Sequence, residues 1–348
     1  MLQAHGYAAG GPGLSLEPYD FERREPGPHD VLVEIQYCGV CHSDIHQVRN
    51  EWGGATYPMV PGHEIVGTAA AVGDQVRKFK VDSQVGVGTF VDSCRSCGPC
   101  KQREEQYCEE GATFTYNSLE RDGKTPTQGG YSTYITVDEA YAFTIPKGIS
   151  PERAAPLLCA GTTTYSPLVH FGVRKHSKIA VVGLGGLGHM AVKLAAAMGA
   201  EVTVLSHSPD KRQDAQRLGA ADFIACDAQK LKESESRFDF VLDTVSAEHD
   251  YNAYLELLRF EGTMILVGLP EPSPVAASAL EGNRRRLVGS NVGGTKDTQE
   301  MLDFCAKHGI GADVEVIPMQ RVGEAFDRTV KSDVRYRFVI DMSSLKGT

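Results

Sequence analysis

The sequence predicts an α/β protein of two domains, one rich in short β-strands and one built on a doubly wound parallel sheet. The first 150 residues alternate short apolar runs with Gly and Pro turns, as in Val31–Tyr37 and Val85–Val91, which is typical of antiparallel strands. From Lys178 to about Ser290, apolar strands alternate with segments of helix length. That alternation is the pattern of parallel strands covered by helices on both faces. With 348 residues, the chain is long enough for each domain to bury its own core.

The elements of the second domain follow one another in order. A helix is expected to start at Ser150-Pro151, because Pro is favoured in the first turn. After the doubly wound region, two helices and two strands are expected to return to the first domain. We therefore place domain one at residues 1–152 and 292–348, and domain two at residues 153–291. Strands are expected at 179–182, 202–205, 223–225, 238–242, 264–267, 314–317 and 337–341, and helices at 187–198, 209–218, 251–259, 298–307 and 322–330.

Composition and charge exclude several classes of function. The formal net charge is −10, and the densest basic cluster is only Arg284-Arg285-Arg286, so neither nucleic acid nor an anionic membrane is an expected partner. No stretch approaches the roughly 20 apolar residues of a membrane span, and the first residues do not resemble a signal peptide. Six of the nine cysteines lie within Cys38–Cys108, which favours metal ligation over disulfides. A cytoplasmic enzyme is the expectation.

A glycine motif predicts a dinucleotide site at the start of the second domain. Gly183, Gly185 and Gly188 have the G-x-G-x-x-G spacing, directly after an apolar strand and at the start of an Ala-rich helix. These glycines allow a tight turn, a close approach of the backbone to a pyrophosphate, and close helix–strand packing. The helix N-terminus then offers N–H groups to the phosphates. The domain is predicted to be a Rossmann domain whose motif residues Gly183, Leu184, Gly185, Gly186, Leu187 and Gly188 contact the cofactor.

The end of the second strand favours NADP(H) over NAD(H). An enzyme that binds NAD would be expected to carry Asp or Glu there, for the ribose 2′-hydroxyl. This chain has hydroxyl and basic residues instead, which suit a 2′-phosphate, and Asp210 lies too far along. The alternative is that the basic residues only solvate a helix surface. The predicted contacts are Ser206, His207, Ser208 and Lys211.

Four cysteines predict a structural zinc site. Cys94, Cys97, Cys100 and Cys108 have the spacing C-x2-C-x2-C-x7-C, with Gly and Pro to bend the loop. Four thiolates this close suit a closed tetrahedral zinc site that organises its own lobe. An iron–sulfur cluster uses related spacings and remains an alternative.

Three further ligands are dispersed along the chain. Cys41, His63 with its neighbour Glu64, and Cys159 would give two thiolates and one imidazole, with one coordination position open for a substrate oxygen. Spacing alone does not separate such a group from buried core residues.

Taken together, these motifs resemble one family. Gly62-His63-Glu64 followed by Gly67, Gly73 and Val76 resembles the zinc signature of medium-chain alcohol dehydrogenases. The resemblance covers nearly the whole chain and is strongest to the cinnamyl alcohol dehydrogenase branch, which includes bacterial broad-range aldehyde reductases. One departure is Val81-Asp82, where the family usually has Gly-Asp, and it puts only a local turn in doubt. The supporting motifs are Cys38-Gly-Val-Cys41-His-Ser-Asp44, Cys94–Cys108, Gly129-Gly130-Tyr131, Cys159-Ala-Gly-Thr, Gly183–Gly188 and Asp333–Asp341.

The resemblance implies a fold and a role for individual residues. The first domain would be GroES-like, and Cys41, His63 and Cys159 would bind a catalytic zinc ion, with Glu64 able to enter its coordination sphere. Asp44 would orient His63. Ser43 would exchange a proton with the substrate and pass it towards His46. The resemblance also implies that His42, Thr163 and either Arg335 or Arg337, of which Arg337 is the choice, contact the cofactor.

The implied activity is a zinc-dependent, NADP(H)-dependent oxidoreductase that interconverts primary alcohols and aldehydes, in a homodimer formed by edges of the nucleotide-domain sheets within Met264–Val292. Two rivals stay open: an NAD-dependent polyol or amino-alcohol dehydrogenase, and a non-catalytic protein that binds zinc and nucleotide. The sequence does not identify the substrate, but aryl or allylic aldehydes would suit an aromatic pocket. Candidate pocket residues are Trp52, Tyr57, Phe90 and Val292, with Tyr116 and Asn291 as further possibilities.

Overall fold

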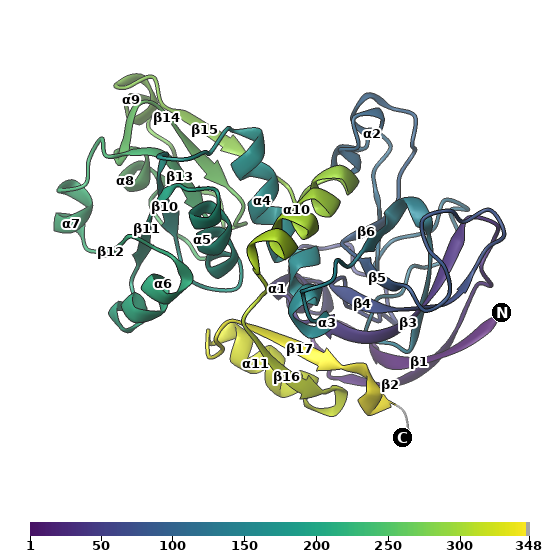
Figure 1. The fold of residues 1–348 in the computed structure, drawn as a ribbon. Helices are drawn as coiled ribbons and strands as arrows, with labels where there is room; N and C mark the ends of the chain where they lie inside the picture. Colours follow the sequence, from purple (N-terminus) through teal and green to yellow (C-terminus); the bar gives the residue numbers. More distant parts are fainter. Residues whose placement is uncertain (346–348) are drawn as a thin grey trace. The chain divides into compact units, whose positions relative to one another are not determined.

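The computed structural model describes residues 1–345, and the chain forms two compact units. The first unit comprises Met1–Cys159 and the chain from Gly294 onward, and the second is Ala160–Gly293. The first unit is drawn mainly in purple, blue and yellow and the second in teal and green (Figure 1). The boundaries expected from the sequence, 152/153 and 291/292, differ from these. Residues 153–159 belong to the first unit because the helical segment from Pro151 to Leu158 packs on strands of its sheet.

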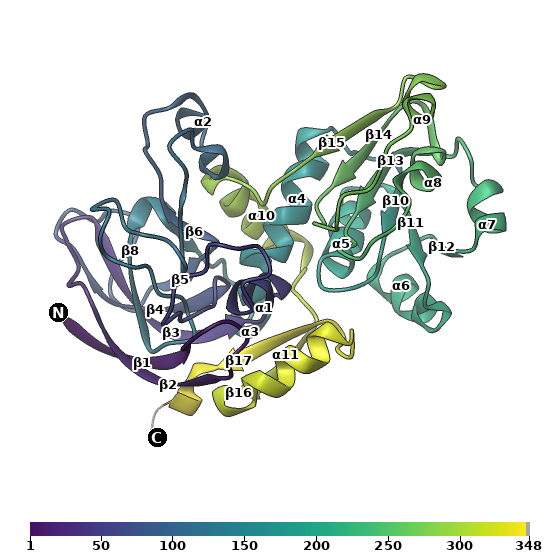
Figure 2. The same cartoon turned by 180° about the vertical axis from the view of Figure 1, so that it is seen from behind.

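The first unit is built on a seven-stranded sheet with the order β16-β17-β3-β4-β5-β9, in which β8 also pairs with β3. Strand β17 pairs antiparallel with β3, so that Val339 lies opposite Gly39. This pairing brings the start of β17 to the loop that leaves β3, and β17 can be followed from behind in Figure 2. The strands are β3 (Asp30–Gly39), β4 (Ile65–Val72), β5 (Gln84–Val87), β8 (Tyr134–Asp138), β9 (Ala142–Thr144), β16 (Val314–Pro318) and β17 (Arg337–Asp341).

Two small sheets and short helices complete the first unit. Strands β1 (Leu2–Ala9) and β2 (Leu16–Arg23) form a hairpin, and β6 (Phe90–Asp92) pairs with β7 (Thr113–Phe114). The α-helices are α1 (His42–Val48), α2 (Gly98–Lys101), α3 (Pro151–Ala154), α10 (Thr295–His308) and α11 (Val322–Val330). The 3₁₀ helices are η1 (Glu105–Tyr107), η2 (Glu139–Tyr141), η3 (Ala155–Leu158), η5 (Met319–Arg321) and η6 (Met342–Leu345).

The second unit is a six-stranded parallel sheet with the order β12-β11-β10-β13-β14-β15. The chain starts in the middle at β10, winds to one edge through β11 and β12, and then crosses back to β13, which is the doubly wound arrangement. The predicted fold class is therefore confirmed. The strands are β10 (Lys178–Val182), β11 (Glu201–Ser206), β12 (Asp222–Ala225), β13 (Phe238–Asp243), β14 (Leu258–Leu266) and β15 (Arg286–Gly289). The helices are α4 (Ala160–His170), α5 (Gly188–Ala197), η4 (Pro209–Lys211), α6 (Arg212–Leu218), α7 (Ala228–Lys232), α8 (Tyr251–Leu255) and α9 (Ala277–Glu281).

Two expected elements differ from the structure. The helix expected at 251–259 ends at Leu255, because Leu258 already begins β14 and pairs with Phe238. The apolar run Val85–Val91 is two strands in different sheets, since Gly88 and Thr89 leave the ladder and bond to the Thr115 segment instead. Both differences arise where tertiary pairing overrides a continuous local pattern.

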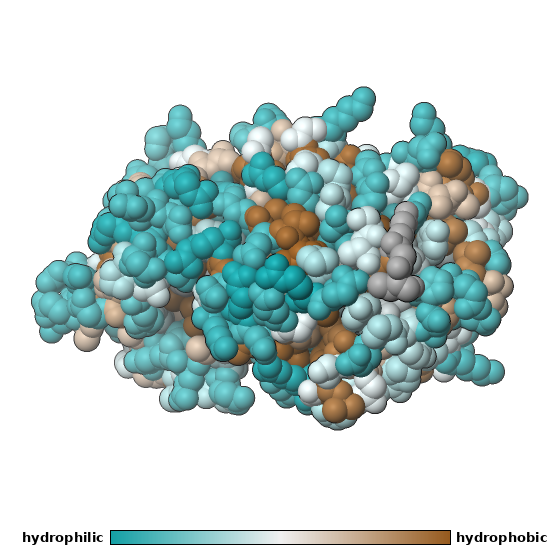
Figure 3. All heavy atoms as spheres, turned by 90° about the horizontal axis from the view of Figure 1, so that it is seen from below, coloured by the Kyte–Doolittle hydropathy of each residue, from teal (hydrophilic) through white to brown (hydrophobic). Residues whose placement is uncertain are grey.

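The surface agrees with the acidic, polar composition. The face drawn in Figure 3 is mostly hydrophilic, with apolar residues in small separate groups. None of the helices within residues 1–345 combines the length and apolar character needed to cross a bilayer.

Candidate functional site

The dispersed ligands predicted from the sequence come together in the first unit. Cys41 follows β3 and precedes α1, His63 and Glu64 lie immediately before β4, and Cys159 follows η3. One ligand atom from each of these four residues lies within 4.8 Å of the others, and all four side chains are buried. Because β3 and β4 are paired neighbours in the sheet, the loops at their ends meet and bring residues 22 positions apart to one point.

The donors of this group fit a zinc ion. Two thiol sulfurs, an imidazole and a carboxylate are the ligand types that zinc takes in proteins. Glu64 Oε2 is a buried oxygen with no hydrogen-bond partner among the described residues, which is costly unless a cation lies beside it. The other Glu64 oxygen pairs with Arg337, which β17 carries to this place. Burial raises the pKa of Glu64 to about 7, although the Arg337 charge acts in the opposite direction.

A buried carboxylate lies behind His63. Asp44, in the first turn of α1, accepts a hydrogen bond from the Cys41 backbone N–H at 2.9 Å. Its other oxygen lies 3.1 Å from His63 Nδ1, so the second ring nitrogen of His63 is left for the metal. A metal-bound imidazole is commonly held by a carboxylate in this way.

Helix α1 also carries the two residues that the resemblance places in a proton relay. Ser43 Oγ lies 3.6 Å from the Cys41 sulfur. His46, one turn further along α1, pairs through Nδ1 with the Glu51 carboxylate. The Trp52 ring stacks on the His46 ring, with centroids 4.8 Å apart. The helix therefore leads from the metal group to a histidine held between a carboxylate and an aromatic face.

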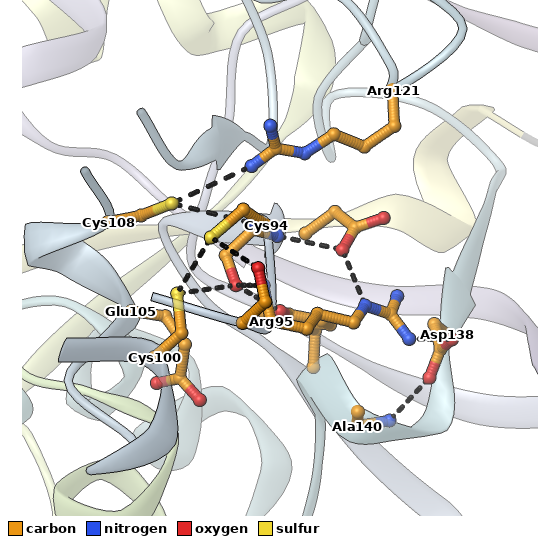
Figure 4. Close-up of polar contacts among 12 residues, drawn as sticks. Cys94, Arg95, Cys100, Glu105, Cys108, Arg121, Asp138 and Ala140 are labelled. Carbon is orange, nitrogen blue, oxygen red and sulfur yellow. Dashed lines mark hydrogen bonds and ion pairs between the residues drawn. The ribbon is translucent and has the colours of Figure 1, made fainter. Parts of the chain in front are cut away.

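The four clustered cysteines form a second metal-ligand group. Their sulfurs lie within 4.8 Å of one another, and Cys94 and Cys100 are 3.8 Å apart. The backbone N–H of Cys97 donates to the Cys94 sulfur, and the backbone N–H of Cys94 donates to the Cys108 sulfur. Both N···S distances are 3.4 Å. Such N–H···S contacts favour thiolates over thiols. Figure 4 shows the sulfurs of Cys94, Cys100 and Cys108 lying close together, with Arg121 beside them. The Arg121 guanidinium is 3.9 Å from the Cys108 sulfur.

The cysteine lobe is joined to helix α10. Glu105, buried just before Cys108, accepts hydrogen bonds from the Thr295 backbone N–H at 2.9 Å and from its hydroxyl at 2.8 Å. Thr295 is the first residue of α10, where the backbone N–H groups have no partner inside the helix. Folding of the lobe thus supplies a cap to a helix nearly 200 residues later in the chain.

The glycine motif has the geometry of a phosphate-binding turn. Gly183 follows β10 directly and has φ of 87°, a left-handed conformation that favours glycine. A Cβ at Gly188 would collide with the Gly183 carbonyl, so the first turn of α5 can lie close to β10 only with glycine there. A Cβ at Gly185 would meet no other atom within 4 Å, apart from those of its two chain neighbours. The turn leaves room for a ligand at the N-terminus of α5.

The hydroxyl and basic residues after β11 lie near this turn. Lys211 donates a hydrogen bond to the Leu184 carbonyl inside the glycine motif, at 3.0 Å. Ser206 is buried at the end of β11 and accepts a hydrogen bond from the Ser208 N–H at 3.2 Å. His207 is exposed. The predicted 2′-phosphate contacts and the predicted pyrophosphate contacts therefore lie in one region of the second unit.

The other predicted residues are more scattered. Thr163 is buried in α4, and Val292 follows β15 in the second unit. His42 is exposed at the start of α1. Tyr57 donates a hydrogen bond to the Val48 carbonyl at the end of α1. Phe90 is buried against Tyr141, beside the cysteine lobe, a placement that favours core packing over substrate contact.

Three side chains of the site have contacts that the sequence does not predict. Glu51 contacts His46 from the loop after α1, Tyr131 donates a hydrogen bond to Asp44, and the Tyr116 ring centroid lies 5.9 Å from that of His63. No pattern around Glu51 distinguishes it. Tyr131 belongs to the family motif Gly129-Gly130-Tyr131 and Tyr116 is a pocket candidate, but neither observation predicts these contacts.

Comparison with known proteins gives consistent matches over both units. Residues 27–147 match the model of the alcohol dehydrogenase GroES-like domain, and residues 186–307 match that of the zinc-binding dehydrogenases. An NADP-dependent alcohol dehydrogenase C from Mycobacterium bovis is 52% identical over 99% of this chain and 100% of its own. A cinnamyl alcohol dehydrogenase from Sorghum bicolor has a similar structure, with a TM-score of 0.95, 45% identity and 98% of each chain covered. A cinnamyl alcohol dehydrogenase from Helicobacter pylori, solved with NADP(H), gives a TM-score of 0.92 and 43% identity over 98% of this chain and 99% of its own.

Proposed function

This chain belongs to the zinc-binding alcohol dehydrogenase family, and we propose that it interconverts primary alcohols and aldehydes with NADP(H) as the hydride carrier. Family membership makes it an oxidoreductase that acts on alcohols, in agreement with the resemblance read from its motifs. Cinnamyl-type and benzyl-type alcohols, with the corresponding aldehydes, are the proposed substrates. One observation carries the proposal: Cys41, His63 and Cys159 converge with a neighbouring carboxylate that has a buried oxygen without a partner in the described chain.

The catalytic roles follow from the donors. Cys41, His63 and Cys159 would hold zinc, with Glu64 as an exchangeable fourth ligand, and Asp44 would fix the His63 ring. When bound, zinc supplies a Lewis acid that polarises the carbonyl of an aldehyde or lowers the pKa of an alcohol. A group of three protein ligands and an open position is what this chemistry requires, whereas a purely structural site would be closed. The open coordination position also argues against the alternative of a non-catalytic protein that binds zinc and nucleotide.

The cofactor roles follow from the second unit. The N-terminus of α5, with Gly183, Gly185 and Gly188, would bind the pyrophosphate, and Ser206, Ser208 and Lys211 would bind the 2′-phosphate. When bound, the reduced nicotinamide supplies the hydride that the aldehyde carbon accepts. No carboxylate stands at the end of β11, which disfavours the rival reading as an NAD-dependent polyol dehydrogenase.

The proton roles lie on α1. Ser43 would donate a proton to the product oxygen in the reductive direction, and His46 would replace it from solvent. Glu51 would hold the His46 ring through Nδ1, and Trp52 would limit its rotation. Trp52 is 45% exposed, so its ring offers an aromatic surface beside the relay. This surface supports the choice of aryl or allylic substrates.

The proposal is tested by initial rates of NADPH and NADH oxidation with cinnamaldehyde and with benzaldehyde, before and after removal of zinc by a chelator. Turnover that prefers NADPH and is lost on chelation is the expected result. Preference for NADH would overturn the cofactor assignment and favour a polyol substrate. Absence of turnover in protein that retains zinc at both cysteine-containing groups would overturn the aldehyde reductase assignment.

The replacement Lys211→Gln is expected to lower kcat/KM for NADPH about tenfold and to leave the value for NADH nearly unchanged. A charge-assisted hydrogen bond is worth about 1.5–3 kcal/mol, and about 1.4 kcal/mol corresponds to a factor of ten. The control is Lys230→Gln, because Lys230 lies on α7 and forms a surface ion pair with Asp227. Equal losses with both cofactors would show that Lys211 supports the glycine turn and not the 2′-phosphate.

The replacement Glu51→Gln is expected to lower kcat about tenfold at saturating NADPH, because a hydrogen bond to a charged group is worth about 1.5–3 kcal/mol. Since the loss is in proton exchange at His46, added imidazole in the buffer should restore part of the rate. Glu17→Gln serves as the control, because Glu17 is an exposed acid on β2. A kcat that is unchanged, or that drops and does not respond to imidazole, would argue against the relay.

A homodimer is also proposed. Strand β15 lies at the edge of the six-stranded sheet, with β14 as its sheet neighbour in the described chain, so its other edge is available for a second copy. Light scattering of the purified protein gives the mass. The Ser290 N–H bonds to Leu266 on β14, so the N–H of the preceding Gly289 faces the other edge of β15, and disruption by Gly289→Pro would support pairing through this edge. A monomeric parent protein would contradict it.

A further inference from the structure

The Asp44 carboxylate is an unusual component of the first unit. Its side chain is fully buried, and the basic group within ion-pair distance in the described chain is His63. A carboxylate removed from water is costly unless hydrogen-bond donors surround it. The residues that supply those donors therefore determine the position of the carboxylate. Through the carboxylate they also determine the orientation of the His63 ring.

In the described chain, four donors converge on this carboxylate. Two are backbone N–H groups, from Cys41 at 2.9 Å and Gly62 at 3.1 Å, and one is the His63 imidazole at 3.1 Å. The fourth is the phenol hydroxyl of Tyr131, which donates at 3.3 Å. The backbone donors and His63 itself belong to the metal-ligand segments, so Tyr131 is the donor that comes from outside them.

Tyr131 contacts the His63 segment in a second way. Its ring lies against Gly62, the residue before His63, where a Cβ would come within 3 Å of the ring. Gly62 has φ of 103°, a conformation that glycine adopts readily. The Tyr131 ring thus packs against the backbone that precedes His63. The hydroxyl of the same side chain holds the Asp44 carboxylate that contacts His63.

The loop that carries Tyr131 is itself held firmly. Its backbone pairs with the loop before His63 through Gly129 N–H to the Val60 carbonyl, at 2.7 Å, and Tyr131 N–H to the Pro61 carbonyl, at 3.0 Å. The Arg23 guanidinium donates to the carbonyl of Gly129 at 2.9 Å. It also donates to the Gln128 carbonyl and the Ser132 hydroxyl. The Tyr131 hydroxyl is therefore presented from a rigid loop.

We propose that Tyr131 is a positioning residue for the catalytic metal site, and that its phenol holds Asp44 so that His63 faces the metal. The inference rests on the proposed catalytic zinc site. Burial raises the pKa of the Tyr131 phenol well above the usual value, and the nearby Asp44 charge acts in the same direction, so the phenol stays a protonated donor. Residues behind a metal-bound histidine usually change metal affinity or activity about 10- to 100-fold when they are replaced.

The test is Tyr131→Phe in the full-length, zinc-loaded protein, because this change removes the hydroxyl and keeps the ring against Gly62. We expect one of the two zinc ions to leave for a colorimetric chelator about tenfold faster, and kcat to fall with little change in KM. Cobalt substituted for zinc identifies the affected site, since a site of four thiolates and one of two thiolates with an imidazole absorb differently. We expect a shift in the second spectrum alone.

A matched control keeps the test specific. Tyr254→Phe removes the hydroxyl of another buried tyrosine, in the second unit, 3.9 Å from Cys226, and should leave both metal sites unchanged. If Tyr131→Phe releases zinc at the wild-type rate and keeps the wild-type cobalt spectrum, the positioning role is overturned, even if thermal stability falls.

This outcome is distinguishable from failure of the proposed function. The wild-type protein alone decides whether NADPH-dependent, zinc-dependent reduction occurs. The Tyr131→Phe variant decides what the Tyr131 hydroxyl does at the site. Its measurements are zinc release and the cobalt spectrum, and neither of them needs turnover.

Discussion

Replacement of His63 by alanine is expected to lower kcat for aldehyde reduction by at least about a thousandfold and to remove one of the two zinc ions. His63 is the one imidazole in the first metal-ligand group, and its loss leaves two thiolates and a carboxylate. The Lewis acid contributes several kcal/mol to the transition state, and every 1.36 kcal/mol is a factor of ten in rate. The substitution also leaves Asp44 buried without its imidazole partner. Zinc content by atomic emission and kcat with NADPH measure both effects.

A matched histidine elsewhere in the first unit supplies the control for that experiment. His5 on β1 is exposed and pairs with Asp20 at 2.7 Å, so His5→Ala should retain both zinc ions and the wild-type kcat. Co-migration with the wild-type protein in gel filtration would show that the His63 variant is folded. Retention of two zinc ions and of full activity in His63→Ala would exclude this group as the catalytic site.

Replacement of Cys108 by serine is expected to destabilise the first unit by about 4 kcal/mol or more, with loss of the other zinc ion. Loss of a structural metal is among the few mechanisms that give so large an effect. The lobe has almost no core of its own, since the segment 93–112 contains only the short helices α2 and η1 and irregular turns around the four sulfurs. Because Glu105 caps α10, loss of the lobe should also loosen that helix. Urea unfolding and limited proteolysis within residues 94–121 measure the change.

The control for this change is Cys226→Ser. Cys226 is half-buried in the second unit and belongs to neither metal-ligand group. It should keep two zinc ions and a urea midpoint close to that of the wild type. Wild-type stability and zinc content in Cys108→Ser would mean that the lobe folds without the metal, in contradiction to the prediction.

The fold and the metal ligands could be predicted where the relevant pattern is continuous in the chain. The strand, glycines and helix around Gly183–Gly188 lie within one short segment, and so do the four cysteines from Cys94 to Cys108. The doubly wound fold class was predicted from the alternation of apolar strands with helix-length segments between Lys178 and about Ser290. The family resemblance then linked Cys41, His63 and Cys159, which are too far apart for spacing to connect them.

The residues that escaped prediction are those that act only through tertiary contacts. Tyr131 reaches Asp44 across 87 positions, and Glu105 reaches Thr295 across 190, through loops that have no periodicity. The element boundaries at Leu258 and Gly88 could not be predicted for the same reason, because they depend on tertiary contacts. In each case a partner strand or loop, and not the local pattern, decides where the element ends.

The pairing of β17 with β3 has a consequence for biosynthesis. The ribosome makes Arg337 almost 300 residues after Cys41, although the two lie in one site. The metal-binding unit therefore stays incomplete until β17 has been made, while residues 160–293 are continuous and can fold as soon as they have emerged. A nascent chain would hold a finished nucleotide-binding unit before it holds a finished reactive centre. Premature termination between Gly293 and β17 would then yield a complete nucleotide-binding unit without the arginine paired with Glu64.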